Sequence, residues 1–210
     1  VDYNQSVFNR AFQSKRQAGS AIKPFLYQTA LNEGYNPASQ LFDIGRTYTY
    51  TVGGVQKKWQ PKNYGGNFQG IVSLRDSLVQ SRNLSTLNLV TDVGVNTTTD
   101  DLKRYGFKDI VDNLSVTLGS MSVNLIEFSQ AYTIFSNNGV QVKPYIVEQI
   151  VNKDGKSVTF EPQRKELNPP EQSYLITSIL KDVVTKGTGR RAAVDGIELA
   201  GKTGTTNDNI

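Results

Sequence analysis

Apolar residues follow two spacings along this chain, one typical of helices and the other typical of strands. Residues 19–31 are mostly apolar, with Pro24 near their start and Gly34 just beyond their end. This pattern predicts a helix that holds Pro24 in its first turn and ends at Gly34. A second helix is predicted over residues 122–136, with Ser122 as its N-cap. Helical spacing also covers residues 71–93, 98–105 and 172–186.

The rest of the chain predicts strands and loops. Residues 140–151 and 156–160 predict a β-hairpin that turns at residues 153–155. Residues 196–206 predict a turn followed by a strand. Polar and glycine-rich composition predicts a long loop over residues 34–69 and a linker over residues 161–170.

Composition narrows the chemistry that the chain can perform. Among 210 residues there is no cysteine and no histidine, so thiol nucleophiles, disulfides and Ser-His-Asp triads are excluded. An acyl-transferring enzyme of this composition would need a serine or threonine nucleophile and a lysine, glutamate or aspartate base. The net charge of +4 is too small to indicate a nucleic-acid partner. We expect no metal and no cofactor.

The sequence contains no apolar run long enough to span a membrane, and its first residues do not resemble a signal peptide. We therefore expect any membrane anchor to lie outside this chain.

Ser20 and Lys23 form a Ser-x-x-Lys motif at the start of the first predicted helix. Residues three apart share a helix face, so the Lys23 amine can reach the Ser20 hydroxyl. Burial and a second nearby cation would lower the pKa of Lys23 and make it a base. The same spacing recurs at Ser178 and Lys181, which we interpret as an ordinary amphipathic helix face. The motif alone is therefore weak evidence.

Two further motifs follow along the chain. Ser81 and Asn83 form a Ser-x-Asn, although residues 122–124 and 136–138 fit that pattern too and are better explained as a helix cap and a helix end. The stronger signal is Lys202-Thr203-Gly204-Thr205, which offers a cation and two hydroxyls for a carboxylate, with a glycine that leaves room for a peptide beside the strand. Together, the three motifs in this order are the signature of penicillin-binding proteins and class A β-lactamases.

The surrounding sequence resembles the transpeptidase domain of class A, bifunctional penicillin-binding proteins. Residues 16–25 are similar to the family's nucleophile segment, except that Ala18 stands where the family usually has proline. The resemblance continues through residues 59–64, 78–83, 131–140 and 186–192. It implies an α+β fold of the penicillin-binding protein and serine β-lactamase type, with an antiparallel sheet flanked by helices and a helical subdomain.

The resemblance also implies a role for each motif residue. Ser20 would be the acyl-ester nucleophile and Lys23 its general base, while Ser81 and Asn83 would assist proton transfer and hold substrate. Residues 202–205 would bind the carboxylate of a peptide donor or of a β-lactam, and the backbone N–H groups of Ser20 and Thr205 would form the oxyanion hole. The reaction would be D,D-transpeptidation of peptidoglycan stem peptides, on the outer face of the bacterial cytoplasmic membrane.

The family has sheet strands before its first motif and after its third, so we expect residues 1–210 to be part of a single transpeptidase domain. The missing strands would come from the rest of the same protein, which could be a second chain, and the parent protein would also carry a glycosyltransferase domain. A β-lactamase or D,D-carboxypeptidase, a non-catalytic β-lactam sensor and a purely structural module remain alternatives. Glu148 and Asn152 could supply a deacylating base, but they fall in the predicted hairpin.

Overall fold

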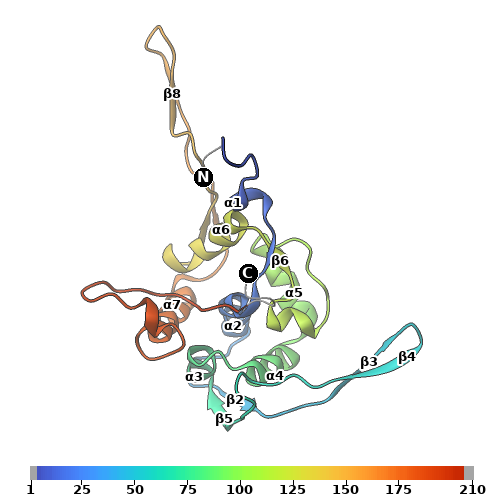
Figure 1. Cartoon of the computed structure of the whole chain (residues 1–210). Coiled ribbons are helices and arrows are strands. Elements are labelled where there is room, and N and C mark those ends of the chain that lie inside the picture. Colours follow the sequence, from blue (N-terminus) through green and yellow to red (C-terminus); the bar gives the residue numbers. More distant parts are fainter. Residues whose placement is uncertain (1–3, 206–210) are drawn as a thin grey trace.

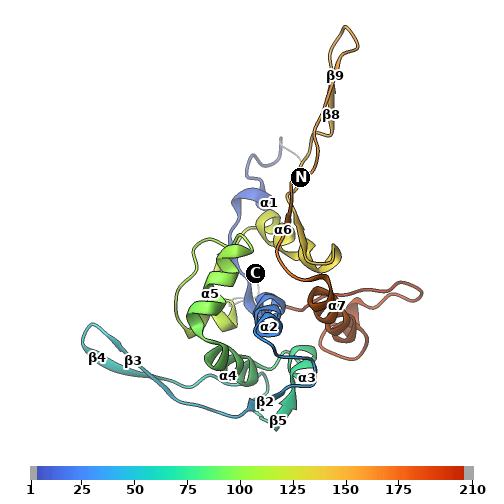
Figure 2. The ribbon, with the colours of Figure 1, turned by 180° about the vertical axis from the view of Figure 1, so that it is seen from behind.

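The computed structural model describes residues 4–205. Helix α2 lies at the centre, and the other long helices surround it (Figures 1 and 2). In chain order the helices are α1 (Arg10–Gln13), η1 (Gly19–Ile22), α2 (Lys23–Asn32), α3 (Leu74–Val79), α4 (Asn83–Val93), α5 (Val95–Arg104), η2 (Leu114–Leu118), α6 (Leu125–Ser136), α7 (Pro170–Thr185) and η3 (Arg190–Ala192), where η marks a 3-10 helix. None of these helices is long and apolar enough to cross a membrane.

The strands form five separate two-stranded antiparallel sheets within the described residues. The pairs are β1 (Arg16–Gln17) with β6 (Ser122–Val123), β2 (Gln40–Asp43) with β5 (Gly70–Ser73), β3 (Tyr48–Val52) with β4 (Val55–Trp59), β7 (Val140–Val142) with β10 (Arg164–Glu166), and β8 (Gln149–Val151) with β9 (Ser157–Thr159). The β3–β4 and β8–β9 hairpins project from the body in different directions (Figures 1 and 2).

Helix α2 is buried on every side, because every residue from Lys23 to Leu31 is buried. A helix that is enclosed all round needs neighbours on every face, and α2 packs against α3, α4, α5 and α7. The Phe25 ring lies at the centre of an aromatic cluster, with ring centroids 5.0–6.2 Å from those of Tyr105, Phe107, Phe128, Tyr132 and Phe135. This packing fixes the start of α2, where Lys23 lies directly after the η1 residue Ser20.

Buried hydroxyl groups join α2 to α3 and α4. The Tyr27 hydroxyl lies 2.5 Å from Ser77 Oγ and 2.9 Å from Thr86 Oγ1. Ser77 Oγ in turn lies 2.5 Å from Ser85 Oγ. Burial raises the pKa of Tyr27 to about 12, so this hydroxyl stays protonated at neutral pH. The cluster holds α2 at a fixed distance from the turn that links α3 to α4.

Several predicted elements differ from the structure. Residues 71–93 are not continuously helical, because residues 70–73 form β5 and Ser73 then caps α3 through the Asp76 N–H. The N-cap of α6 is Asn124 rather than Ser122, which lies in β6. Asn124 is the N-cap because its side-chain oxygen accepts a hydrogen bond from the Glu127 N–H at 2.8 Å. The first helix, by contrast, has Pro24 in its first turn as predicted, although the α-helix begins at Lys23 and Ser20 lies in the preceding η1.

The predicted loops contain strands that sequence patterns did not reveal. The 34–69 segment holds β2, β3 and β4. The predicted hairpin turns at residues 153–155, but only β8 and β9 pair there. Residues 140–142 pair instead with β10, inside the predicted 161–170 linker. Residues 196–205 form no strand, because their one pairing among residues 4–205 is an isolated bridge between Ile197 and Val194. Thr206 of that predicted strand lies outside the described residues.

Candidate active site

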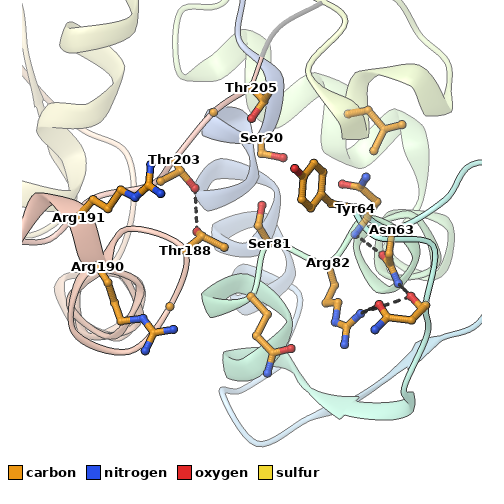
Figure 3. Close-up of a pocket in the computed structure, with 16 residues that line it drawn as sticks. Ser20, Asn63, Tyr64, Ser81, Arg82, Thr188, Arg190, Arg191, Thr203 and Thr205 are labelled. Atoms are coloured by element: carbon orange, nitrogen blue, oxygen red, sulfur yellow. Dashed lines mark hydrogen bonds between the residues drawn. The ribbon is translucent and has the colours of Figure 1, made fainter. Parts of the chain in front are cut away.

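A cavity of about 1010 Å³ lies where η1, the α3–α4 turn and the segment after α7 meet. Figure 3 shows Ser20 and Ser81 between two walls, with Tyr64, Asn63 and Arg82 on one side and Thr188, Arg191 and Thr203 on the other. Of the predicted site residues, six line this cavity: Ser20, Ser81, Asn83, Thr203, Gly204 and Thr205. The structure thus brings together parts of three motifs that are far apart in the sequence.

The half-buried Ser20 is held by a tightly packed backbone. Gly19 has a φ of +52°, and its N–H donates to Gly119 O at 3.2 Å. On the other side of η1, the Tyr132 hydroxyl donates to Ala21 O at 2.7 Å. A Cβ on Gly19 would lie 2.4 Å from Thr205 O, a distance that side chains do not tolerate. Glycine is therefore required at this position so that the nucleophile segment and the third motif can touch.

Lys23 is fully buried, and its amine points at the second motif. Its Nζ donates to Ser81 O at 2.8 Å, to Arg82 O at 3.1 Å and to Asn83 Oδ1 at 2.7 Å. Burial, followed by the positive charge of Lys202, holds the pKa of Lys23 well below its usual range, against a smaller opposing effect of Asp43. No hydrogen bond joins Lys23 to the Ser20 hydroxyl in the described part of the chain.

Ser81 lies between the two lysines. Its carbonyl accepts from Lys23, while its hydroxyl accepts from Lys202 Nζ at 2.7 Å. Ser81 has a φ of +56°, an unusual conformation for a non-glycine residue and one that turns its carbonyl and side chain toward different partners. Burial lowers the pKa of Lys202 to about 8. Because both amines reach the same serine, the charge state of each one affects the other.

Asn63, which was not predicted as a site residue, positions the second motif. Its Oδ1 accepts from the backbone N–H groups of Asn83 at 2.8 Å and Leu84 at 3.1 Å, so it caps α4 from a distant loop. Its Nδ2 donates to Asp43 Oδ1 and to Asn67 O, both at 2.8 Å. Residue 63 lies within a segment that carries the family resemblance, but only the fold shows what its side chain does.

A buried ion pair supports the same wall. Arg82 Nη1 lies 3.5 Å from Asp43 Oδ2, and the Asp43 side chain is fully buried. The other polar contacts of Asp43 are with Asn63 and with the Gln69 N–H at 2.9 Å. This carboxylate is therefore satisfied by structural partners and does not face the cavity.

The third motif runs as an extended segment beside η1. Thr203 Oγ1 shares a 2.7 Å hydrogen bond with Thr188 Oγ1, which the sequence did not single out. Lys202 Nζ also donates to Thr203 O at 3.0 Å. A Cβ on Gly204 would lie 3.1 Å from Ala18 O and 3.3 Å from Ala21 Cβ. Gly204 thus allows close packing against the nucleophile segment, which differs from the predicted reason of leaving space for a peptide.

The repeated copies of the weaker motifs lie elsewhere. Lys181 pairs with Glu198 at 2.7 Å, and Ser178 accepts from Arg75 at 3.1 Å, both away from the cavity. Asn124 caps α6, and Ser136 ends it. The interpretation of these copies as structural is confirmed.

Comparison with known proteins agrees with this geometry. Residues 2–209 match the model of the penicillin-binding protein transpeptidase domain. The chain belongs to this family. It is 31% identical to penicillin-binding protein 1A of Pseudomonas aeruginosa over 261 residues, covering 99% of the chain and 32% of that relative. The chain therefore spans about a third of the relative's length.

Solved structures give the same fold for this transpeptidase chain. It superposes on penicillin-binding protein 1A from Haemophilus influenzae with a TM-score of 0.89 at 31% identity, covering 98% of this chain and 37% of that one. An imipenem acyl-enzyme complex of penicillin-binding protein A from M. tuberculosis matches with a TM-score of 0.80 at 20% identity, covering 94% of this chain and 50% of that one. The predicted family and its mixed helix and strand fold are confirmed.

Proposed function

We propose that this chain carries the site of a D,D-transpeptidase, which forms a seryl acyl-enzyme on Ser20 and is acylated there by β-lactams. The observation that carries the proposal is the fully buried Lys23, whose amine is held by Ser81 O, Arg82 O and Asn83 Oδ1 beside the cavity that Ser20 lines. Burial and the positive charge of Lys202 hold the pKa of this amine well below its usual range, which suits the amine to the role of a general base.

Acylation would proceed in two steps. The Lys23 amine would first exchange one of its acceptors in the second motif for the Ser20 hydroxyl, to which it makes no hydrogen bond in the described structure. The hydroxyl would then give its proton to the neutral amine while its oxygen bonds to the carbonyl carbon of the donor peptide. The backbone N–H groups of Ser20 and Thr205 would hold the negative charge on the carbonyl oxygen. The C–N bond then breaks, and the leaving D-alanine amine takes a proton through the Ser81 hydroxyl. An amine from a neighbouring strand later takes the acyl group and frees Ser20.

The third motif would bind the donor through its terminal carboxylate. Lys202 supplies a charge close to Ser81, and the Thr203 and Thr205 hydroxyls lie on the cavity wall. Asn83 would hold substrate with its amide. A β-lactam carries a carboxylate and a strained amide and would therefore use the same contacts.

A hydrolytic enzyme would need a base that activates water. Within the described lining of the cavity there is no aspartate or glutamate. Glu148 and Asn152 flank β8 in a hairpin that projects from the body, as Figure 1 shows for β8. Acyl transfer to an amine is therefore favoured over rapid deacylation by water.

We also propose that residues 1–210 are part of a single transpeptidase domain, completed by strands from the rest of the same protein. The short two-stranded sheets and the 32% coverage of the Pseudomonas aeruginosa relative support this. The parent protein would carry a glycosyltransferase domain and a membrane anchor, and would act on stem peptides at the outer face of the cytoplasmic membrane. A preparation of residues 1–210 alone that folds and reacts with penicillin would contradict the proposal.

Intact-mass analysis of the full-length protein after benzylpenicillin treatment tests the acylation site. We expect the mass of one penicilloyl group to be added, to persist for many minutes and to be lost in Ser20→Ala. A label that survives in Ser20→Ala would overturn the assignment of the nucleophile. Cross-linking of lipid-linked peptidoglycan by the same preparation separates a transpeptidase from a sensor that is acylated only.

A further inference from the structure

The charge of the cavity exceeds what one substrate carboxylate requires. Its described lining holds three arginines, Arg82, Arg190 and Arg191, and no acidic residue. Arg82 is neutralised by the buried Asp43. The charge of Lys202, whose amine donates to Ser81 Oγ and Thr203 O, is the one proposed above to bind the terminal carboxylate of the donor. An uncompensated positive charge thus remains at Arg190 and Arg191.

Neither of these two guanidinium groups has a partner among the described residues. Both residues are exposed, and no hydrogen bond, ion pair or ring contact from either side chain exists within residues 4–205. In the described chain Arg75 pairs with Asp182 at 2.6 Å, and Arg82 and Arg104 are also paired. The remaining arginines of that part of the chain are as unpaired as Arg190 and Arg191, but none of them lines the cavity. Two exposed guanidinium groups on a cavity wall whose described lining has no acidic residue leave positive charge available to an anionic ligand.

The backbone that carries the two arginines is held in place. Gly187 lies so close to α3 that a Cβ would be 2.5 Å from Val79 O. The Thr188 N–H donates to Val79 O at 3.3 Å, and the Gly189 N–H donates to Val183 O at 2.9 Å. The hydrogen bond between the hydroxyls of Thr188 and Thr203 ties this segment to the third motif. Figure 3 shows Arg191 beside Thr203 and Arg190 near Thr188.

We propose that Arg190 and Arg191 form a second anion subsite, which takes a carboxylate on the acyl donor other than the one at its reacting end. This rests on the proposed function, since the donor is the molecule that fills the cavity in front of Ser20. A guanidinium group presents paired N–H donors that match a carboxylate, and it stays charged at every relevant pH. The subsite would make the enzyme select donors with an additional negative charge.

Two penicillins that differ by one carboxylate test the subsite. Benzylpenicillin and its α-carboxy derivative share the ring system and the ring carboxylate, so their ratio isolates the additional charge. We expect Arg190→Gln and Arg191→Gln each to lower the second-order acylation rate constant for the α-carboxy derivative, relative to that for benzylpenicillin, by about fivefold, as expected for loss of one exposed ion pair. Arg191→Lys should recover part of the loss because it keeps the charge.

The control is Arg164→Gln, which removes the same charge from β10, outside the cavity lining. It should leave the ratio of the two rate constants at the wild-type value. An unchanged ratio in the double variant Arg190→Gln/Arg191→Gln, or an equal loss for both penicillins, would overturn the subsite while leaving acylation of Ser20 intact. Absence of any penicillin label on the wild-type full-length protein would instead overturn the proposed function.

Discussion

Replacing Asn63 with alanine tests whether this side chain builds the second motif from a distance. Its Oδ1 supplies the acceptor for the first two backbone N–H groups of α4, because the N-cap residue Arg82 makes no side-chain cap of its own. Its Nδ2 is one of the donors that satisfy the fully buried Asp43. The substitution therefore breaks a helix cap and removes a donor from a buried carboxylate at the same time.

The expected loss of stability follows from these contacts. Removal of a helix cap costs about 1 kcal/mol. Loss of a hydrogen bond to a buried charged group costs about 2 kcal/mol more. We therefore expect Asn63→Ala to lower the free energy of unfolding by about 3 kcal/mol. The acylation rate should fall by about tenfold or more, because Asn83, one of the acceptors of the Lys23 amine, loses its fixed position.

Asn67→Ala is the matched control. Among the described residues the Asn67 side chain accepts a hydrogen bond only from Arg82 Nη1, at 3.2 Å, and its backbone contact with Asn63 survives the substitution. We expect a loss below about 1 kcal/mol. Urea unfolding and the second-order rate constant for benzylpenicillin measure both effects in the full-length protein. The reasoning is refuted if Asn63→Ala and Asn67→Ala unfold at the same denaturant concentration.

Three further predictions concern the reacting groups. The acylation rate should rise with pH as Lys23 loses its proton, at a pH well below the usual lysine pKa. Above a pH of about 8 the rate should fall, because Lys202 loses its charge. A rate that does not change with pH would contradict these roles. Lys202→Gln should move the rising limb to higher pH, because the pKa of Lys23 is then lowered by burial alone; an unmoved limb would show that the two amines do not interact. Gly19→Ala should abolish measurable acylation, because the added Cβ would clash with Thr205 O. The control Gly201→Ala should be tolerated, because its Cβ would meet only one methyl group, at 3.9 Å. Equal penicillin labelling of the two variants would refute this reasoning.

The structure differs most from the sequence prediction in the segment between the first two motifs. Residues 34–69 lack an obvious period, since β2 is short and β3 and β4 form a hairpin with mostly exposed side chains. Such strands are stabilised by pairing rather than by burial, so no apolar alternation marks them. The same holds for β10, whose residues are all exposed, so that its sequence has the polar composition of a linker.

The sequence by itself determined the chemistry of this protein, because the chain lacks cysteine and histidine and its serine, lysine and threonine motifs occur in a family-specific order. It also indicated the helices, through proline, glycine and the spacing of apolar residues. Local rules suffice there, because caps, turns and short motifs depend on neighbouring residues. Only the tertiary structure decided that Lys23 points at Ser81 rather than bonding to Ser20, that Asn63 caps α4, and that Gly19 must lack a side chain. These features depend on contacts between residues far apart in the chain, and burial and close approach exist only once the helices have packed around α2.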